Sequence, residues 1–329
     1  MQGLVTVFGG SGFLGGQIVR ALAKRGLRVR VAVRNPGRGY RLRMLGDVGQ
    51  IEVVQANVRF PDSIDRALEG AEAVINCVAV LFECGSQNFE ALNAAGAKAI
   101  AEAAAARGIT RFVQVSALGA DAHSASKYAR SKAEGEAAVR EAIPSAVILR
   151  PSVIFGQDDH FFNFFASMAT LPIPLMPLPL VGGGKTRFQP VYVADVAKAA
   201  ATALVDPAAA GRTFELGGPE VMSFEQLMKL MLAEIGRKRT LLPIPFGLAS
   251  LLGGLGDLQA ALRSMLGLIP SPPLTTDQVR LLQSDNVVSE GAPGLADLGV
   301  TPTAMEVVIP TYLWRYRKGG QYADQLQTA

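Results

Sequence analysis

Apolar positions in the first half of the chain follow two alternating patterns. Short apolar or alternating runs predict strands at 3–8, 27–33, 51–55, 73–80, 111–115 and 146–149. Helical patterns lie between them, from Phe13 to a stop at Gly26 and then over 62–69, 88–107 and 126–142. Strands that alternate with helices predict a parallel sheet covered on both faces. The fold class is therefore α/β, a doubly wound parallel sheet of the Rossmann type.

This rhythm breaks after Pro151, which predicts a Rossmann domain over 1–155 and a smaller C-terminal lobe over 156–329. The lobe is expected to contain helices at 194–205 and 223–235 and a short strand at 213–216.

Two stretches of this lobe are poor in charge. Residues 160–184 contain no Lys, Arg, Asp or Glu, and 240–276 contain only Asp257 and Arg263. The segment 240–276 also follows a basic cluster at 237–239, a combination typical of a membrane surface. A buried helix would give the same composition, but we favour an interface with a partner, the bilayer or both.

Composition excludes several other classes of protein. With 49% hydrophobic residues among 329, the chain is not disordered. Two cysteines and two histidines predict neither a disulfide framework nor a metal site, and a reducing compartment is the simplest expectation. We see no signal peptide and no apolar run of about 20 residues. A net charge of +4 is weak support for nucleic acid, and none is expected as a partner.

The strongest motif is Gly9-Gly10-Ser11-Gly12-Phe13-Leu14-Gly15, which contains G-x-G-x-x-G. It follows a predicted strand and opens a predicted helix, the context that a dinucleotide site requires. Glycines let the backbone approach the pyrophosphate, and the start of the helix offers N–H groups to it.

The residue after the second strand is Arg34, where a site specific for NAD would place an acidic residue. Between Arg20 and Arg43 there are nine basic residues and no acidic one. An arginine suits a 2′-phosphate, so we predict NADPH as the cofactor. A solvated basic face, anionic lipid or an acidic partner would use the same residues.

Tyr128 and Lys132 form a Y-x-x-x-K pair, which places both side chains on one face of a helix. A nearby ammonium is expected to lower the tyrosine pKa, as a proton donor to a carbonyl requires. Ser116, at the end of the fifth strand, is either a carbonyl-polarising group or a turn cap.

These motifs, with the run Leu149-Arg150-Pro151-Ser152-Val153-Ile154-Phe155-Gly156, resemble an extended or atypical short-chain dehydrogenase/reductase (SDR). The resemblance implies that Ser116, Tyr128 and Lys132 are the catalytic set. It also places Asn57 and Val58 by the adenine, although aspartate is commoner at position 57. The cofactor contacts it implies are Gly9, Gly10, Ser11, Gly12, Phe13, Leu14, Gly15, Arg34, Asn57, Val58, Val78, Ala79, Ser116, Tyr128, Lys132, Pro151 and Val153.

Within this superfamily, the runs 126–136, 154–166 and 189–197 are similar to the NADPH-binding accessory subunits of respiratory complex I. That resemblance implies a structural or regulatory NADPH and a seat on the hydrophilic arm near the quinone site. In a bacterium, this would be the cytoplasmic face of the inner membrane. An NADP-dependent reductase of an apolar carbonyl or quinone-like substrate is the alternative. An NmrA-like redox-sensing regulator is a weaker one, because such proteins usually lack the Tyr–Lys pair.

Overall fold

A seven-stranded parallel sheet forms the centre of the larger domain in this computed structural model, which describes residues 3–172, 177–265 and 272–322. Its strand order is β11-β6-β5-β4-β1-β2-β3. The strands are β1 (Leu4–Phe8), β2 (Arg28–Val33), β3 (Ile51–Gln55), β4 (Ala71–Asn76), β5 (Arg111–Val115), β6 (Val147–Pro151) and β11 (Thr213–Leu216). This confirms the predicted fold class.

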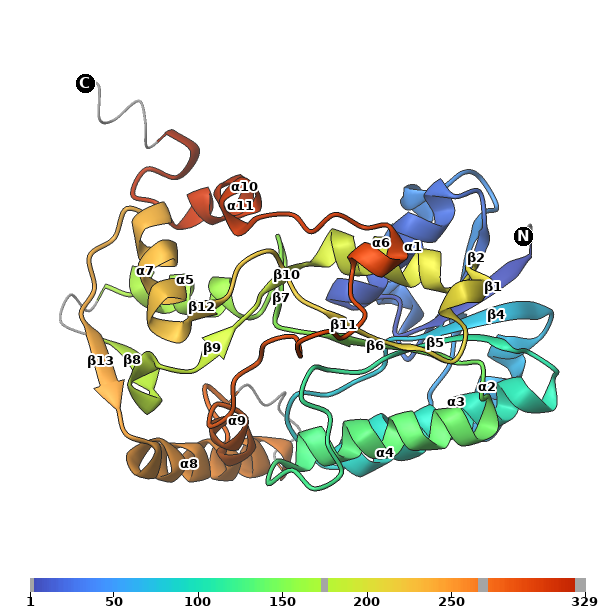
Figure 1. Ribbon diagram of the computed structural model, residues 1–329, viewed down its shortest axis with the longest axis horizontal. Coiled ribbons are helices and arrows are strands. Elements are labelled where there is room, and N and C mark those ends of the chain that lie inside the picture. Colours follow the sequence, from blue (N-terminus) through green and yellow to red (C-terminus); the bar gives the residue numbers. More distant parts are fainter. Residues whose placement is uncertain (1–2, 173–176, 266–271, 323–329) are drawn as a thin grey trace.

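Helices cover both faces of the sheet (Figure 1). On one face lie α1 (Phe13–Lys24) and α6 (Val193–Ala203), and on the other lie α2 (Pro61–Leu68), α3 (Ala95–Ala106) and α4 (Lys127–Ala142). The strands carry apolar residues on both sides because both sides are covered. Val5 and Val7 point into one core cluster, and Phe8 and Val74 into the other.

Two predicted elements differ in detail from the structure. The fourth strand ends at Asn76 rather than at residue 80 because side chains replace its ladder: Asn76 Oδ1 accepts Val78 N and Asn93 Oδ1 accepts Val80 N. The predicted helix 88–107 opens with a π-helical turn, Glu90–Ala94, before α3. The end of β4 lies beside the glycine loop, and the π-helical turn is joined to it through Asn93; irregular backbone of this kind often marks a functional region.

The smaller lobe contains most of the chain after residue 155, together with the short strand β7 (Ile154–Phe155). Its strands are β8 (Leu178–Val181), β9 (Arg187–Phe188), β10 (Val191–Tyr192), β12 (Met222–Ser223) and β13 (Leu241–Ile244). Its helices are α5 (Phe162–Thr170), α7 (Phe224–Glu234), α8 (Phe246–Met265), α9 (Thr276–Leu281), α10 (Met305–Val308) and α11 (Pro310–Leu313). The phenylalanines of 161–165 pack on Phe188 and Phe224 in its core.

Residues 156–329 do not all lie in this lobe. β11 pairs with β6 and extends the main sheet, and α6 packs against α1 on the face of that sheet. Two segments that follow the boundary expected between residues 155 and 156 therefore belong to the larger domain.

Candidate functional site

The glycine loop turns sharply between β1 and α1 and leaves no room for a side chain at Gly9, Gly10 or Gly15. Gly9 has a φ of +76°, and a Cβ atom there would lie 3.1 Å from the carbonyl carbon of Cys77. A Cβ atom on Gly15 would lie 2.7 Å from Cα of Gly10, which is closer than real Cβ atoms come. Gly12 caps α1 without a side-chain hydrogen bond, and the first turn of the helix holds no acidic residue. This bare, electropositive helix end fits a dinucleotide pyrophosphate.

The loop lies where the strand order of the sheet reverses, between β1 and β4. Ligands of open α/β sheets bind at this point, outside the carboxyl ends of the strands. The backbone of Cys77 and Val78 lies against Gly9, so the predicted contact Val78 lies beside the glycine loop, and Ala79 follows it directly. Pro151 ends β6 at this edge, and Val153 follows it and packs on the smaller lobe.

Arg34 and Asn57 follow the neighbouring parallel strands β2 and β3, at the same carboxyl edge of the sheet. Arg34 is exposed and its Nη1 donates to Gln87 Oε1 at 2.6 Å. Asn57 Oδ1 accepts the backbone N–H of Arg59, so the side chain closes its own turn. Val58 is buried in the second core cluster, so an adenine contact by Val58 remains a prediction.

Ser116 and Lys132 are both buried at the carboxyl edge of β5. Within the described residues, Ser116 Oγ has no hydrogen-bond partner, so Ser116 is not the turn cap that was one expectation. Lys132 is 3% exposed and its Nζ donates to the carbonyl of Val115 at 3.1 Å. A buried hydroxyl without a hydrogen-bond partner is unfavourable. A ligand oxygen is therefore favoured as the missing partner of Ser116 Oγ.

The pKa values of the Tyr–Lys pair differ from expectation. Burial raises the pKa of Tyr128 to about 12, and in the part of the chain that the structure describes no charge lowers it. The prediction that Lys132 lowers the tyrosine pKa is therefore wrong for this structure. Burial lowers the pKa of Lys132 to about 8, while Glu136 and Cys77 oppose that shift. Desolvation thus favours the neutral form of both groups.

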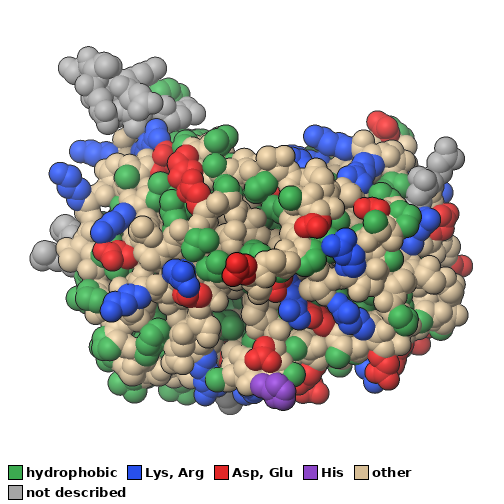
Figure 2. Space-filling view, viewed as in Figure 1, with side chains coloured by type: hydrophobic (Ala, Val, Ile, Leu, Met, Phe, Trp, Pro, Cys, Tyr) green, Lys and Arg blue, Asp and Glu red, His purple; other side chains and the backbone are tan. Residues whose placement is uncertain are grey.

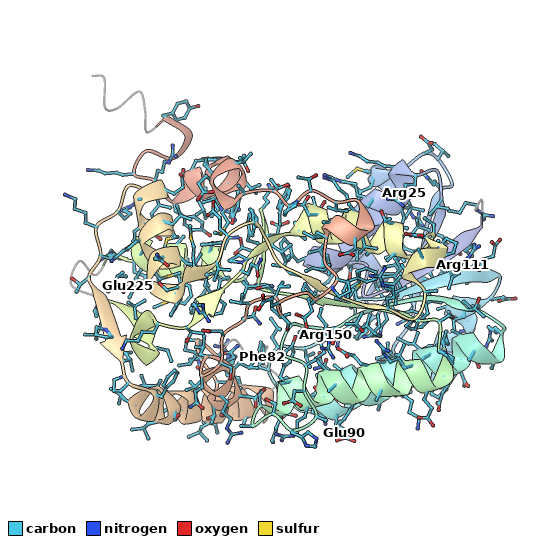
Figure 3. The ribbon with its side chains drawn as sticks, in the orientation of Figure 1. Arg25, Phe82, Glu90, Arg111, Arg150 and Glu225 are labelled. Carbon is cyan, nitrogen blue, oxygen red and sulfur yellow. The ribbon has the colours of Figure 1, made fainter. Side chains whose placement is uncertain are left out.

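Glu136, one turn after Lys132, is itself paired with a partly buried arginine, Arg150. The Arg150 side chain lies between β6 and α4 (Figure 3) and donates to both carboxylate oxygens of Glu136, at 2.9 and 2.6 Å. Such a bidentate pair holds its partners in a fixed geometry. It therefore fixes the middle of α4 on the sheet.

Asp277, in α9 of the smaller lobe, was missed by the sequence analysis. Its carboxylate caps the start of α4: it accepts Ser126 Oγ at 2.7 Å, the N–H of Lys127 at 2.7 Å and the N–H of Tyr128 at 3.1 Å. An anion at a helix N-terminus is favourable. The helix that carries the Tyr–Lys pair is therefore positioned from the other lobe, by a residue about 150 positions away that no local pattern predicts.

The surface of α8 is apolar on its solvent side. Alanine and glycine face inward at Ala249, Gly253, Gly256 and Ala260. The outer face carries six leucines, each 41–66% exposed: Leu248, Leu251, Leu252, Leu255, Leu258 and Leu262. Figure 2 shows hydrophobic side chains along the lower left edge of the molecule, over α8. Apolar patches of this kind mark interaction sites.

No helix in the described ranges combines the length and the apolar character needed to cross a membrane.

The fold and the glycine loop together define a dinucleotide-binding protein of the Rossmann type. The family model described as the NAD dependent epimerase/dehydratase family matches residues 5–217, and the chain belongs to this family.

Among curated proteins, the chain is 38% identical over 317 residues to "NADH dehydrogenase [ubiquinone] 1 alpha subcomplex subunit 9, mitochondrial" of Mus musculus. That similarity covers 95% of this chain and 80% of the mouse protein. The chain is also 41% identical over 176 residues to "Ceramide reductase" of Caulobacter vibrioides, covering 52% of this chain and 54% of that protein.

Among solved structures, the NADPH-dependent quinone oxidoreductase of Escherichia coli has a TM-score of 0.70 at 20% identity. This match covers 94% of this chain and 98% of that one, and it supports the fold.

Proposed function

We propose that this protein is an NADP(H)-binding accessory subunit of respiratory complex I, in which the nucleotide stabilises the fold rather than being turned over. The similarity to the mouse complex I subunit carries the proposal, because it extends over 95% of the chain and so includes the smaller lobe.

The choice of NADP(H) rests on Arg34. This arginine directly follows β2, at the position where NAD-specific sites use an acidic residue to bind the ribose. Arg34→Ala is expected to weaken NADPH retention more than NADH retention. Nucleotide release measured on the purified chain tests this, and equal loss of both nucleotides would contradict it.

The leucine face of α8 is the surface we assign to the complex, near the quinone site and on the cytoplasmic face of a bacterial inner membrane. Each of its six leucines is roughly half exposed, and transfer of such a side chain out of water is favourable by about 1 kcal/mol. The one acidic residue of the helix, Asp257, accepts the N–H of Thr276. This face therefore suits the membrane surface beside the hydrophilic arm.

A native gel of solubilised membranes tests the assembly. The chain is expected to migrate with NADH dehydrogenase activity, and its deletion should reduce the assembled complex. Migration apart from that activity would refute the proposal.

A second candidate is an NADP-dependent reductase of an apolar ketone, and the unpartnered, buried Oγ of Ser116 favours it. With Tyr128 and Lys132 present, this hydroxyl would polarise the carbonyl while tyrosine supplies the proton. The similarity to the Caulobacter ceramide reductase points to lipid-like substrates. Tyr128→Phe separates the two functions: a reductase loses turnover, whereas a structural subunit keeps its bound nucleotide and its place in the complex.

A further inference from the structure

Two arginines beyond the carboxyl ends of β2 and β3 form hydrogen bonds with one loop. Arg34 Nη1 donates to Gln87 Oε1 at 2.6 Å, and Arg59 Nη1 donates to the carbonyl of Ser86 at 3.4 Å. The arginines follow β2 and β3, which are neighbours in the sheet, with Val33 opposite Gln55. Two guanidinium groups from the segments that follow these strands therefore bond to consecutive residues of the loop, Gln87 and Ser86.

The loop, residues 84–87, is also fixed independently of the arginines. Cys84 and Gln87 exchange two backbone hydrogen bonds, each of 2.9 Å. The preceding residue, Glu83, accepts the N–H of Phe89 at 3.2 Å and lies 3.6 Å from Lys127 Nζ at the start of α4. The loop therefore presents preformed acceptor groups to Arg34 and Arg59.

We infer that Arg34 and Arg59 form one site for the 2′-phosphate of NADP(H), and that Gln87 competes with this phosphate for Arg34. The inference deepens the proposed function and rests on its choice of nucleotide. A phosphate oxygen is charged and binds a guanidinium more strongly than a neutral amide oxygen does. Arg34 Nη1 is the nitrogen that Gln87 occupies, so a 2′-phosphate that binds at Nη1 displaces Gln87 and gives up the Arg34–Gln87 hydrogen bond. NADH carries no 2′-phosphate and leaves that bond intact, so Gln87 narrows the preference for NADPH.

Calorimetric titration of the full chain with NADPH, NADH and 2′,5′-ADP tests both parts. Arg59→Ala is expected to weaken NADPH and 2′,5′-ADP about tenfold and to leave NADH unchanged. Arg66→Ala, an exposed arginine of α2, is the matched control. Gln87→Leu keeps the side-chain size but removes the acceptor, and should tighten NADPH about threefold without affecting NADH. Ser86→Ala is its control, because Ser86 contacts Arg59 through its backbone.

Two substitutions of Gln87 are expected to change the affinity for NADPH in opposite directions. Gln87→Glu should weaken NADPH, since a carboxylate binds Arg34 more strongly than an amide and repels the phosphate. If Arg59→Ala does not fold, Arg59→Gln replaces it. Equal loss of NADPH and NADH in the Arg59 variant would overturn its assignment. A Gln87→Leu variant that binds NADPH no more tightly than the wild type would overturn the competition.

The two proposals fail in different ways. If the wild-type chain binds NADH as tightly as NADPH, the choice of nucleotide in the proposed function is wrong. If the wild type prefers NADPH and only Arg34→Ala removes this preference, the proposed function stands and the inference about Arg59 and Gln87 falls.

Discussion

The carboxylate of Asp277 is expected to contribute more to stability than its partly exposed position suggests. It accepts three hydrogen bonds from Ser126, Lys127 and Tyr128, and its side chain is 13% exposed. Hydrogen bonds to charged groups are each worth about 1.5–3 kcal/mol, and an anion at a helix N-terminus adds up to about 1 kcal/mol at an ordinary site. Because Asp277→Asn keeps the shape and one acceptor oxygen, we expect a loss of about 2–3 kcal/mol rather than the full sum.

Urea unfolding and amide hydrogen exchange measure this effect. The free energy of unfolding should fall by that amount, and exchange at the amides of Lys127 and Tyr128 should speed up at least tenfold. Asp285→Asn is the matched control, because this carboxylate of the same lobe is 39% exposed, pairs with Arg187 and caps no long helix. The reasoning is refuted if both variants lose the same stability and the two α4 amides keep their protection.

Three further predictions concern the loop, the lysine and the outer helix. Gly15→Ala should abolish NADPH binding in calorimetry, because a Cβ atom there would collide with the backbone of the loop. Gly16→Ala should not, because a Cβ atom on Gly16 would lie 3.6 Å from the nearest side chain. Lys132→Met should stabilise the nucleotide-free chain at pH 7 by about 3 kcal/mol, because protonation of a buried lysine whose pKa falls from 10.5 to about 8 opposes folding. That advantage should shrink as pH rises from 8 to 10.5 in urea unfolding, and a constant difference would contradict it. Leu251→Ser with Leu255→Ser should reduce flotation with vesicles about 30-fold, by about 2 kcal/mol, whereas Val307→Ser, equally exposed on α10, should not.

The sequence predicted the parts of the fold that depend on neighbours along the chain. Strand and helix periods located the six strands before residue 155, because burial on both faces requires nearly continuous apolar runs. The glycine loop was recognisable because its spacing and its strand–helix context are both local. The expected lowering of the Tyr128 pKa by Lys132 failed, because a pair on one helix face reveals nothing about how deeply each group is buried.

Contacts between distant segments left no such signal. β11 joins the main sheet although a lobe separates it from β6 in sequence, and Gln87 reaches Arg34 across 53 positions. The composition of 240–276 indicated an interface, but hydrophobic content alone does not predict that leucines lie on the outer face of the helix and that alanines and glycines lie on the inner face. Which side of α8 faces inward depends on how closely the helix approaches the backbone of α9. A Cβ atom on Gly253 would lie 2.7 Å from the backbone N of Thr276, so only small residues fit on the inner side.

Two sets of contacts, α8 with α9 and α9 with α4, connect the leucine-bearing helix α8 to the candidate site. α8 is fixed to α9 by Gly253 against Thr276 and by Asp257 accepting the Thr276 N–H, and α9 is fixed to α4 by Asp277. A partner that binds the leucine face of α8 therefore restrains α8 and α9. Through Asp277, α9 in turn holds the first turn of α4, the helix that carries Tyr128. Conversely, loss of Asp277 frees α4 without touching the leucines. Asp277→Asn should therefore leave vesicle binding intact while it loosens the site, because the two surfaces share a scaffold but no side chain.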